Sequence, residues 1–269
     1  MVSAQSLDSV ARALVAPGKG ILAADESAGT IKKRFDTIKL EATEENGRRY
    51  REMLFTTEGA NRFVSGVILY DATIRQSTKD GVRFVDLLEK QGIIPGIKVD
   101  TGTKPLPGSP KETITEGMDG LRQRLGEYRG MGAKFAKWRA VIDIAPGVPS
   151  PLAIRANAEL LARYAMTCQE EGIVPIVEPE VLMDGDHDLA RCDEVTTATL
   201  HEVFSALHAY GVRLEGMLLK PNMVISGKKA GKQASAEEVA EATLRCFRRT
   251  VPAAVPGIVF LSGGQGDEQ

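Results

Sequence analysis

Charged side chains recur where apolar runs of this chain end, and several of them can do carbonyl chemistry together. Lys137 and Lys220 each lie in or after such a run, and Glu178 belongs to the run between them. A lysine amine attacks a carbonyl carbon only when it is neutral, and burial or a neighbouring cation favours the neutral form. One of the two lysines can therefore be the nucleophile and the other its electrostatic partner.

Two carboxylates at run ends fit the proton transfers of such a reaction. Glu178 can move protons while a carbinolamine forms and loses water, and Asp25 can take the hydroxyl proton whose loss breaks a carbon–carbon bond. For any one of these charges, a structural ion pair is an equal alternative. Their joint position at run ends favours a site.

Two further groups of residues are suited to anions. A turn near the C-terminus offers a hydroxyl and backbone amides that can hold a phosphate, from Ser262, Gly263 and Gly264. Cations for a second anionic group come from Lys98, Arg139 and Arg34. The predicted substrate is therefore an anionic carbonyl compound with a phosphate at both ends.

Alternating strand-like and helix-like segments must position these residues. Seven apolar runs predict strands over 18–27, 63–70, 92–100, 133–144, 172–182, 214–223 and 257–264. Amphipathic segments separate them, and one helix face is marked by Leu200, Val203, Phe204 and Leu207. Ser235 and Glu238 form a capping box that opens another helix. This alternation predicts an α/β fold with a parallel sheet, whose strand C-termini gather the chemistry.

Composition excludes several classes of protein. The 269 residues carry 34 Lys plus Arg against 36 Asp plus Glu and are 5% aromatic, which argues against nucleic-acid binding. No apolar run reaches the roughly 18 residues that span a bilayer. No low-complexity linker divides the chain, so we expect one domain over residues 1–269.

The N-terminus and the cysteines predict the compartment. The first residues show no secretory signal pattern. Cys168, Cys192 and Cys246 are far apart, which argues against disulfides or a thiolate zinc site and fits a reducing environment. We therefore expect a cytoplasmic protein that acts on a small molecule, without nucleic-acid or membrane partners.

Seven motifs in chain order resemble the class I, Schiff-base-forming fructose-bisphosphate aldolases. They are GKGILAADES, GIKVD, KFAKWR, IVPIVEPE, DGDHDL, LEGMLLKPNM and FLSGGQ, from about residue 17 to 266. The resemblance implies a TIM-type (β/α)8 barrel, commonly a homotetramer, that needs no cofactor or metal. It also implies the reversible cleavage of fructose 1,6-bisphosphate to dihydroxyacetone phosphate and glyceraldehyde 3-phosphate in glycolysis and gluconeogenesis. A monophosphate ketose stays open as the preferred substrate.

The resemblance implies a role for each matching residue. Lys220 would form the Schiff base, Glu178 would be the general acid and base, and Lys137 would be the second active-site lysine. Asp25 would assist bond cleavage and hold both lysines in register, with Glu180 as a supporting ion-pair partner. The phosphate on the dihydroxyacetone side would be held by Ser262, Gly263 and Gly264. The other end would be held by Ser27, Thr30 (often Ser in the family), Arg34 and Lys98, with Arg139 nearby.

The family pattern extends beyond the motifs of this chain. The family continues after the seventh strand with an eighth strand that carries a phosphate-binding arginine, and with a tail that ends in tyrosine. The chain ends at Gln269, so the resemblance predicts seven of eight strands and a C-terminally incomplete barrel. The alternative function is therefore a catalytically impaired fragment, or a scaffold or binding form of the same fold.

Three other patterns are weaker. LSGGQ also resembles the signature loop of ABC-transporter ATPases, but the GxxxxGK[ST] motif is missing. The histidines His187, His201 and His208 lie away from predicted strand ends, so we expect solvated or capping roles and no metal site. The acidic loop that begins at Asp184 lacks the glycine and glutamate positions of an EF-hand.

Overall fold

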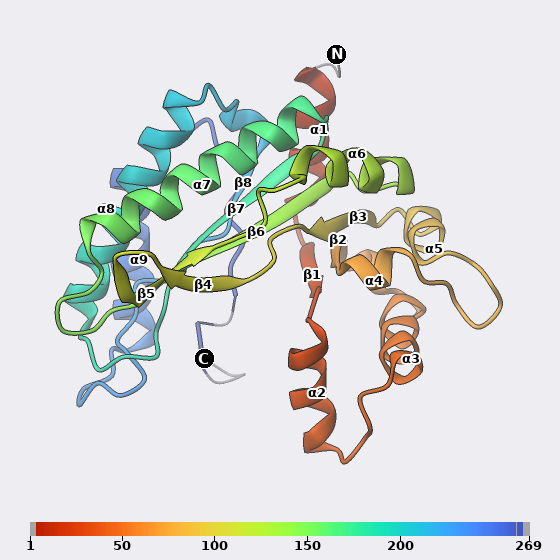
Figure 1. The fold of residues 1–269 in the computed structure, drawn as a ribbon, viewed down its shortest axis with the longest axis horizontal. Coiled ribbons are helices and arrows are strands. Elements are labelled where there is room, and N and C mark those ends of the chain that lie inside the picture. Colours follow the sequence, from red (N-terminus) through yellow and green to blue (C-terminus); the bar gives the residue numbers. More distant parts are fainter. Residues whose placement is uncertain (1–3, 262, 266–269) are drawn as a thin grey trace.

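The protein is described here by a computed structural model that covers residues 4–261 and 263–265. Its centre is a parallel six-stranded sheet with the order β1-β2-β3-β6-β7-β8, and helices lie against it (Figure 1). The strands of this sheet are β1 (Gly20–Ala24), β2 (Val64–Leu69), β3 (Ile94–Lys98), β6 (Phe135–Ile142), β7 (Val174–Val181) and β8 (Leu218–Leu219). The α/β fold with a parallel sheet is confirmed, and the curled sheet is consistent with a TIM-barrel-type fold.

Helices connect and cover these strands in chain order. They are α1 (Ala4–Leu14), α2 (Ala28–Thr37), α3 (Glu44–Phe55), α4 (Asp71–Ile74), α5 (Phe84–Lys90), α6 (Leu121–Met131), α7 (Pro151–Glu170), α8 (Leu189–Ala209) and α9 (Ala236–Thr250), with 3-10 turns η1 (Ala60–Arg62) and η2 (Leu214–Gly216). The predicted capping box at the start of α9 is confirmed, because Ser235 and Glu238 exchange both hydrogen bonds. The predicted apolar face of α8 is buried as well.

Two of the seven predicted strands are much shorter in the structure. The run 214–223 begins with η2 and contributes only the two residues of β8, after which Pro221 has no N–H to continue the ladder. The run 257–264 contributes one parallel bridge, in which Leu219 pairs with Ile258. The Leu219 amide donates to the Gly257 carbonyl at 3.3 Å and the Val259 amide donates to the Leu219 carbonyl at 2.9 Å, so this pairing centres on Leu219, the last residue of β8.

A hairpin that the sequence analysis does not predict joins β3 to α6. Its strands, β4 (Thr103–Leu106) and β5 (Ser109–Thr115), are antiparallel and form a separate two-stranded sheet. The turn between them is Pro107-Gly108, and Gly108 has a positive φ of 83°. The Pro-Gly pair between the two strands is the sequence signal for this turn.

Aromatic packing fixes the outer layer of the sheet. The Trp138 side chain on β6 is fully buried, and its ring centroid lies 5.5 Å from that of Tyr164 on α7. The Tyr164 hydroxyl donates a hydrogen bond to the carbonyl of Ile176 on β7 at 3.2 Å. The prediction that Trp138 packs between strand and helix is therefore confirmed. On the other face, α1 residues such as Leu7 and Leu14 pack with apolar side chains of β6, β7 and β8.

Gly96 on β3 lies against the ring of Phe135, and a Cβ atom there would overlap the ring carbons. We expect Gly96→Ala to lower the free energy of unfolding by about 1–3 kcal/mol, because the core must move to accept the methyl group. The matched control is Gly130→Ala in α6, where a Cβ meets no atom within 4 Å. This change should raise stability by about 0.5–1 kcal/mol. Urea unfolding of both variants checks the pair, and a stabilised Gly96→Ala protein contradicts the packing described.

The carboxylate of Glu112 on β5 fastens the hairpin to the start of α7. It accepts hydrogen bonds from the Ser150 amide at 2.6 Å, the Ser150 hydroxyl at 2.5 Å and the Ser109 hydroxyl at 2.7 Å. Burial alone raises the pKa of Glu112, but these hydrogen bonds prevail and lower the pKa below its usual value of 4.5. The charged carboxylate is therefore stabilised in the folded protein.

Because the hydrogen bonds from Ser150 and Ser109 favour the charged Glu112 carboxylate, we expect the stability of the protein to depend on pH in the acidic range. Glu112→Gln is expected to lower the free energy of unfolding at pH 7 by about 1.5–3 kcal/mol. Because the folded-state pKa is depressed, the wild-type advantage is complete above pH 4.5 and is lost as the pH falls through the folded-state pKa. Urea unfolding of both proteins between pH 7 and pH 3 measures this. If the difference in unfolding free energy between the wild type and Glu112→Gln stays constant or grows on acidification, this role of the charged Glu112 carboxylate is ruled out.

Candidate active site

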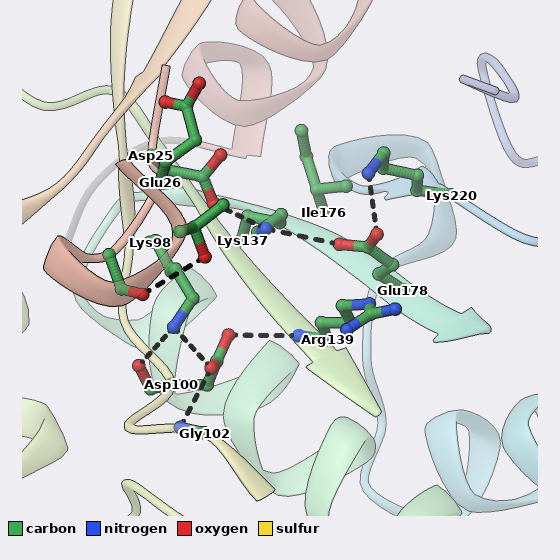
Figure 2. A network of polar contacts seen from close by, with 12 residues as sticks. Asp25, Glu26, Lys98, Asp100, Gly102, Lys137, Arg139, Ile176, Glu178 and Lys220 are labelled. Carbon is green, nitrogen blue, oxygen red and sulfur yellow. Dashed lines mark hydrogen bonds and ion pairs between the residues drawn. The ribbon is translucent and has the colours of Figure 1, made fainter. Parts of the chain in front are cut away.

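Glu178 on β7 contacts two lysines from neighbouring elements. One oxygen, Oε1, lies 2.6 Å from Nζ of Lys220, directly after β8, and Oε2 lies 3.5 Å from Nζ of Lys137 on β6 (Figure 2). Only 1% of the Glu178 side chain is exposed, so the carboxylate is held in a desolvated setting. A buried carboxylate between two ammonium groups can pass a proton between partners without reaching bulk water.

Strand register explains why these charges meet. On β6 and β7, Arg139 pairs with Glu178 along a ladder that runs without a bulge from Phe135 to Ile142. Side chains at alternate strand positions point to the same face, so Lys137 and Arg139 share the inner face of the sheet. Trp138 lies between them in sequence and points to the helix layer. The charges therefore line the inside of the curled sheet, and the apolar residues face the helices.

Asp25 completes the cluster from the other edge of the sheet. It directly follows β1, is buried, and its Oδ2 lies 2.6 Å from Nζ of Lys137. Glu178 is the residue that contacts both lysines, whereas the ion pair of Asp25 is with Lys137. The two carboxylates thus hold Lys137 from opposite sides.

The two carboxylates also determine the charge of Lys137. Burial by itself lowers the pKa of this ammonium group, but the charges of Glu178 and Asp25 outweigh burial and raise the pKa above its usual value. Lys137 is therefore a cation at neutral pH. Of the two lysines, it is poorly suited to attack a carbonyl and well suited to stabilise negative charge.

A second set of charges lies further along the same face. Nζ of Lys98 at the end of β3 lies 2.6 Å from Oδ1 of Asp100, and Nε of Arg139 lies 2.5 Å from Oε2 of Glu180. Burial by itself lowers the pKa of Arg139, but the hydrogen bond that Arg139 donates to Glu180 and the negative charges of Glu180, Glu178 and Asp100 together outweigh burial, so the net shift is upward. Asp100 also accepts the Arg139 amide at 3.2 Å, which joins the segment after β3 to the middle of β6 (Figure 2).

A cavity of about 780 Å³ opens over these groups. Its lining includes six of the predicted site residues, namely Asp25, Ser27, Thr30, Lys98, Lys137 and Arg139. Glu178, Lys220, Glu180 and Arg34 are not among the residues that line it. Ser27 is the N-cap residue of α2, and its hydroxyl lies 3.3 Å from that of Thr30. Arg34, later in α2, is mostly exposed and pairs with Glu26 at 2.6 Å. The space is large enough for a sugar bisphosphate and is bordered by cations.

Comparison with known proteins places the chain among relatives with one shared name. The family model for fructose-bisphosphate aldolase class-I matches residues 6–269. The chain belongs to the class I fructose-bisphosphate aldolase family. A probable fructose-bisphosphate aldolase class 1 of Xanthomonas campestris is 60% identical over 268 residues, which are 100% of this chain and 80% of that protein. A cytoplasmic aldolase isozyme of Spinacia oleracea is 55% identical over 95% of this chain and 71% of its own length.

A solved aldolase structure agrees with this assignment. The aldolase of Plasmodium falciparum, in a ternary complex with TRAP and a small-molecule inhibitor, superposes with a TM-score of 0.96 at 51% identity. The match covers 98% of this chain and 77% of that one. The predicted family and the barrel-type α/β fold are thus confirmed.

The SGG turn of this aldolase is described in part. Ser262 lies outside the described residues, and Gly263 and Gly264 both have positive φ, at 63° and 72°. A Cβ on Gly264 would come within 2.7 Å of the Met183 sulfur, so the turn also packs against the loop that follows β7. Both glycines are needed for this conformation.

Sequence reasoning was wrong about one histidine. His201 and His208 are exposed on α8, as expected, but His187 is buried with 7% of its surface accessible. Its carbonyl accepts the Gly227 amide at 2.8 Å, because the acidic loop packs under the loop after β8. The capping role falls instead to Asp188, whose carboxylate accepts the Arg191 amide at the start of α8. Within residues 4–261 and 263–265, no group of three or more His, Cys, Asp or Glu side chains is placed to hold a metal ion.

Several charged or polar residues around the site received no role from the sequence. Asp100 holds Lys98, and Glu26 pairs with the buried Arg51 at 2.7 Å as well as with Arg34. Asn222 is buried beside Lys220. Asp100, Glu26 and Asn222 all lie at the C-terminal ends of predicted strands, which is the signal that points to them. Of the helices in the part of the chain that the structure describes, none is long and apolar enough to cross a membrane.

Proposed function

We propose that this chain is a cytoplasmic class I aldolase that cleaves fructose 1,6-bisphosphate reversibly through a Schiff base on Lys220. The observation that carries the proposal is the contact of one buried carboxylate, that of Glu178, with both Lys220 and Lys137. The names of relatives at 55–60% identity support the same substrate. Residues 1–269 act as one domain, and we expect a homo-oligomer, as a tetramer by family resemblance.

Schiff-base formation follows from the position of Glu178. Its Oε1 takes a proton from the Lys220 ammonium group 2.6 Å away, and the neutral amine adds to the C2 carbonyl of the sugar phosphate. The added nitrogen then gives one proton to the oxyanion, which forms the carbinolamine hydroxyl. Glu178 returns its own proton to this hydroxyl, which leaves as water and gives an iminium ion. The charged Lys137 stabilises the negative charge that develops on the carbonyl oxygen during attack.

Bond cleavage uses the carboxylate on the other side of Lys137. Asp25 takes the proton of the C4 hydroxyl, the C3–C4 bond breaks, and its electrons flow to the iminium nitrogen to form an enamine. The aldehyde product, glyceraldehyde 3-phosphate, leaves. Protonation of the enamine carbon and hydrolysis of the imine then release dihydroxyacetone phosphate and restore the Lys220 amine.

The cations of the cavity hold the substrate's phosphates. Lys98 and Arg139, with the hydroxyls of Ser27 and Thr30, line the cavity, and Arg34 adds charge from α2. Glu180 acts through its ion pair with Arg139. The phosphate on the dihydroxyacetone side is assigned to Ser262, Gly263 and Gly264, which follow the segment paired with β8.

The test is a cleavage assay with fructose 1,6-bisphosphate and fructose 1-phosphate, in which triose phosphate release is measured with and without a chelator. We expect cleavage of both, a higher kcat/KM for the bisphosphate because the second phosphate meets the Lys98 side of the cavity, and no loss on chelation. Release of no triose phosphate from either substrate would refute the proposal. Loss of activity with the chelator would point to a metal-dependent lyase.

A further inference from the structure

The strand that ends just before Lys220 is unusually short, although Lys220 needs an accurate position. β8 pairs with β7 only at Leu218 and Leu219, and the last backbone bond of this ladder runs from the Lys220 amide to the Val177 carbonyl at 2.8 Å. Pro221 follows and has no N–H. Lys220 therefore stands at the point where regular pairing stops, although β7 continues to Val181.

This arrangement leaves a buried backbone donor on β7. Residues 177, 179 and 181 present their backbone groups to the β8 side, since the next amide, that of Leu182, bonds to Ile142 of β6 at 2.9 Å. Residue 179 is a proline without an N–H, so the Val181 amide is the next donor that needs a partner. A longer β8 would supply a carbonyl at this level.

The Asn222 side chain takes the place of that missing carbonyl. Its Oδ1 accepts the Val181 amide at 3.1 Å, and its Nδ2 donates to the Thr196 hydroxyl of α8 at 2.9 Å and to the Met223 carbonyl at 2.9 Å. The residue is 5% exposed, so these bonds are formed away from water. One amide thus links the segment after Lys220 to the end of β7 and to α8.

We propose that Asn222 is a positioning residue for Lys220, and that Thr196 is its anchor on α8. The tie restrains the backbone two residues after Lys220 and so keeps Nζ against Glu178, which itself projects from the strand that Asn222 holds. This inference rests on the proposed function, because it concerns the rate at which Lys220 forms its Schiff base. Neither Asn222 nor Thr196 reaches the cavity.

Two buried threonines on α8 supply a matched test. The Thr196 hydroxyl accepts from Asn222, whereas the Thr199 hydroxyl, one turn later and equally buried, makes no hydrogen bond within the described part of the chain. Valine replaces threonine with nearly the same shape, so Thr196→Val removes the anchor and Thr199→Val removes a hydroxyl without a partner. Thr196→Ser keeps the hydroxyl and should restore wild-type behaviour.

The experiment measures kcat, KM and the initial rate at which borohydride traps dihydroxyacetone phosphate on Lys220. We expect Thr196→Val to lower kcat and the trapping rate by about ten- to hundredfold, the scale of a small misplacement of a reacting group. KM should stay within about twofold, and Thr199→Val and Thr196→Ser should match the wild type. A purely structural role would lower the unfolding temperature and leave the trapping rate of the folded protein unchanged.

The inference is overturned if the Thr196→Val protein traps the adduct as fast as the Thr199→Val protein does. In that case the proposed function still stands, provided that the wild type traps the adduct on Lys220. A wild type that forms no adduct refutes both. Should Thr196→Val fail to fold, Asn222→Ser, whose side chain is too short for both partners, must show the same loss. The double variant should be no slower than the slower single variant, since both changes break one link.

Discussion

Replacing Lys220 by methionine is expected to lower kcat for fructose 1,6-bisphosphate by about 10⁴–10⁶-fold, the scale of losing a covalent nucleophile. Methionine keeps the length of the side chain but has no amine to add to the carbonyl. Lys137 cannot take over, because Glu178 and Asp25 raise its pKa and hold it as a cation. Steady-state cleavage assays measure the loss.

The matched control for this change is Lys134→Met. Lys134 precedes β6 at the end of the sheet away from the site, is half-exposed, and pairs with Glu89 at 3.7 Å. We expect its kcat and KM to equal those of the wild type. A Lys220→Met protein that keeps more than about one hundredth of wild-type activity would contradict the assignment of the nucleophile.

Glu178→Gln is expected to lower kcat by about 10²–10⁴-fold, the usual contribution of a general acid and base. The amide has nearly the shape of the carboxylate, but it cannot take the proton from Lys220 or return it to the carbinolamine. Because the negative charge of Glu178 raises the pKa of Lys137, this change should also lower that pKa and weaken the stabilisation of the developing oxyanion at alkaline pH.

The pH profile separates this effect from a general loss of structure. Wild-type Lys137 should stay charged as the pH rises until its raised pKa is reached, whereas in Glu178→Gln the charge should be lost at a lower pH. The residual activity of the variant should therefore fall earlier on the alkaline side. Glu194→Gln, on the exposed surface of α8 where Glu194 pairs with Arg191, is the control and should behave as the wild type. A tenfold or smaller loss in Glu178→Gln would contradict its role.

Much of the fold could be predicted because the local signals agree with the tertiary structure. Runs of β-branched residues bounded by glycine and charge give the strands β1, β2, β3, β6 and β7 within two or three residues of their ends. These local signals fail where the length of a strand is set by its backbone pairing with a neighbouring strand and not by the strand propensity of its residues. The run 214–223 looks like a full strand, yet Pro221 limits its pairing with β7 to two residues. The strands of the hairpin β4–β5 are mostly polar and short of apolar residues, so apolar runs do not predict them.

The site divides in the same way. Lys137, Glu178 and Lys220 could be found because a charge in a buried strand is costly and therefore informative. The partners that hold them could not be found so easily. Asn222 acts through the Val181 amide and Thr196, which are distant in sequence and come together only in the folded chain. His187 is buried by a loop contact for which the sequence gives no periodic signal.

The central claim, that Lys220 is the residue that bonds to the substrate, is tested most directly by trapping. The protein is incubated with dihydroxyacetone phosphate and borohydride, digested, and analysed by mass spectrometry to locate the modified residue. We expect one stable adduct per chain, on Lys220, and none in Lys220→Met. An adduct on Lys137 or on any other lysine, or no adduct in an active protein, would contradict it.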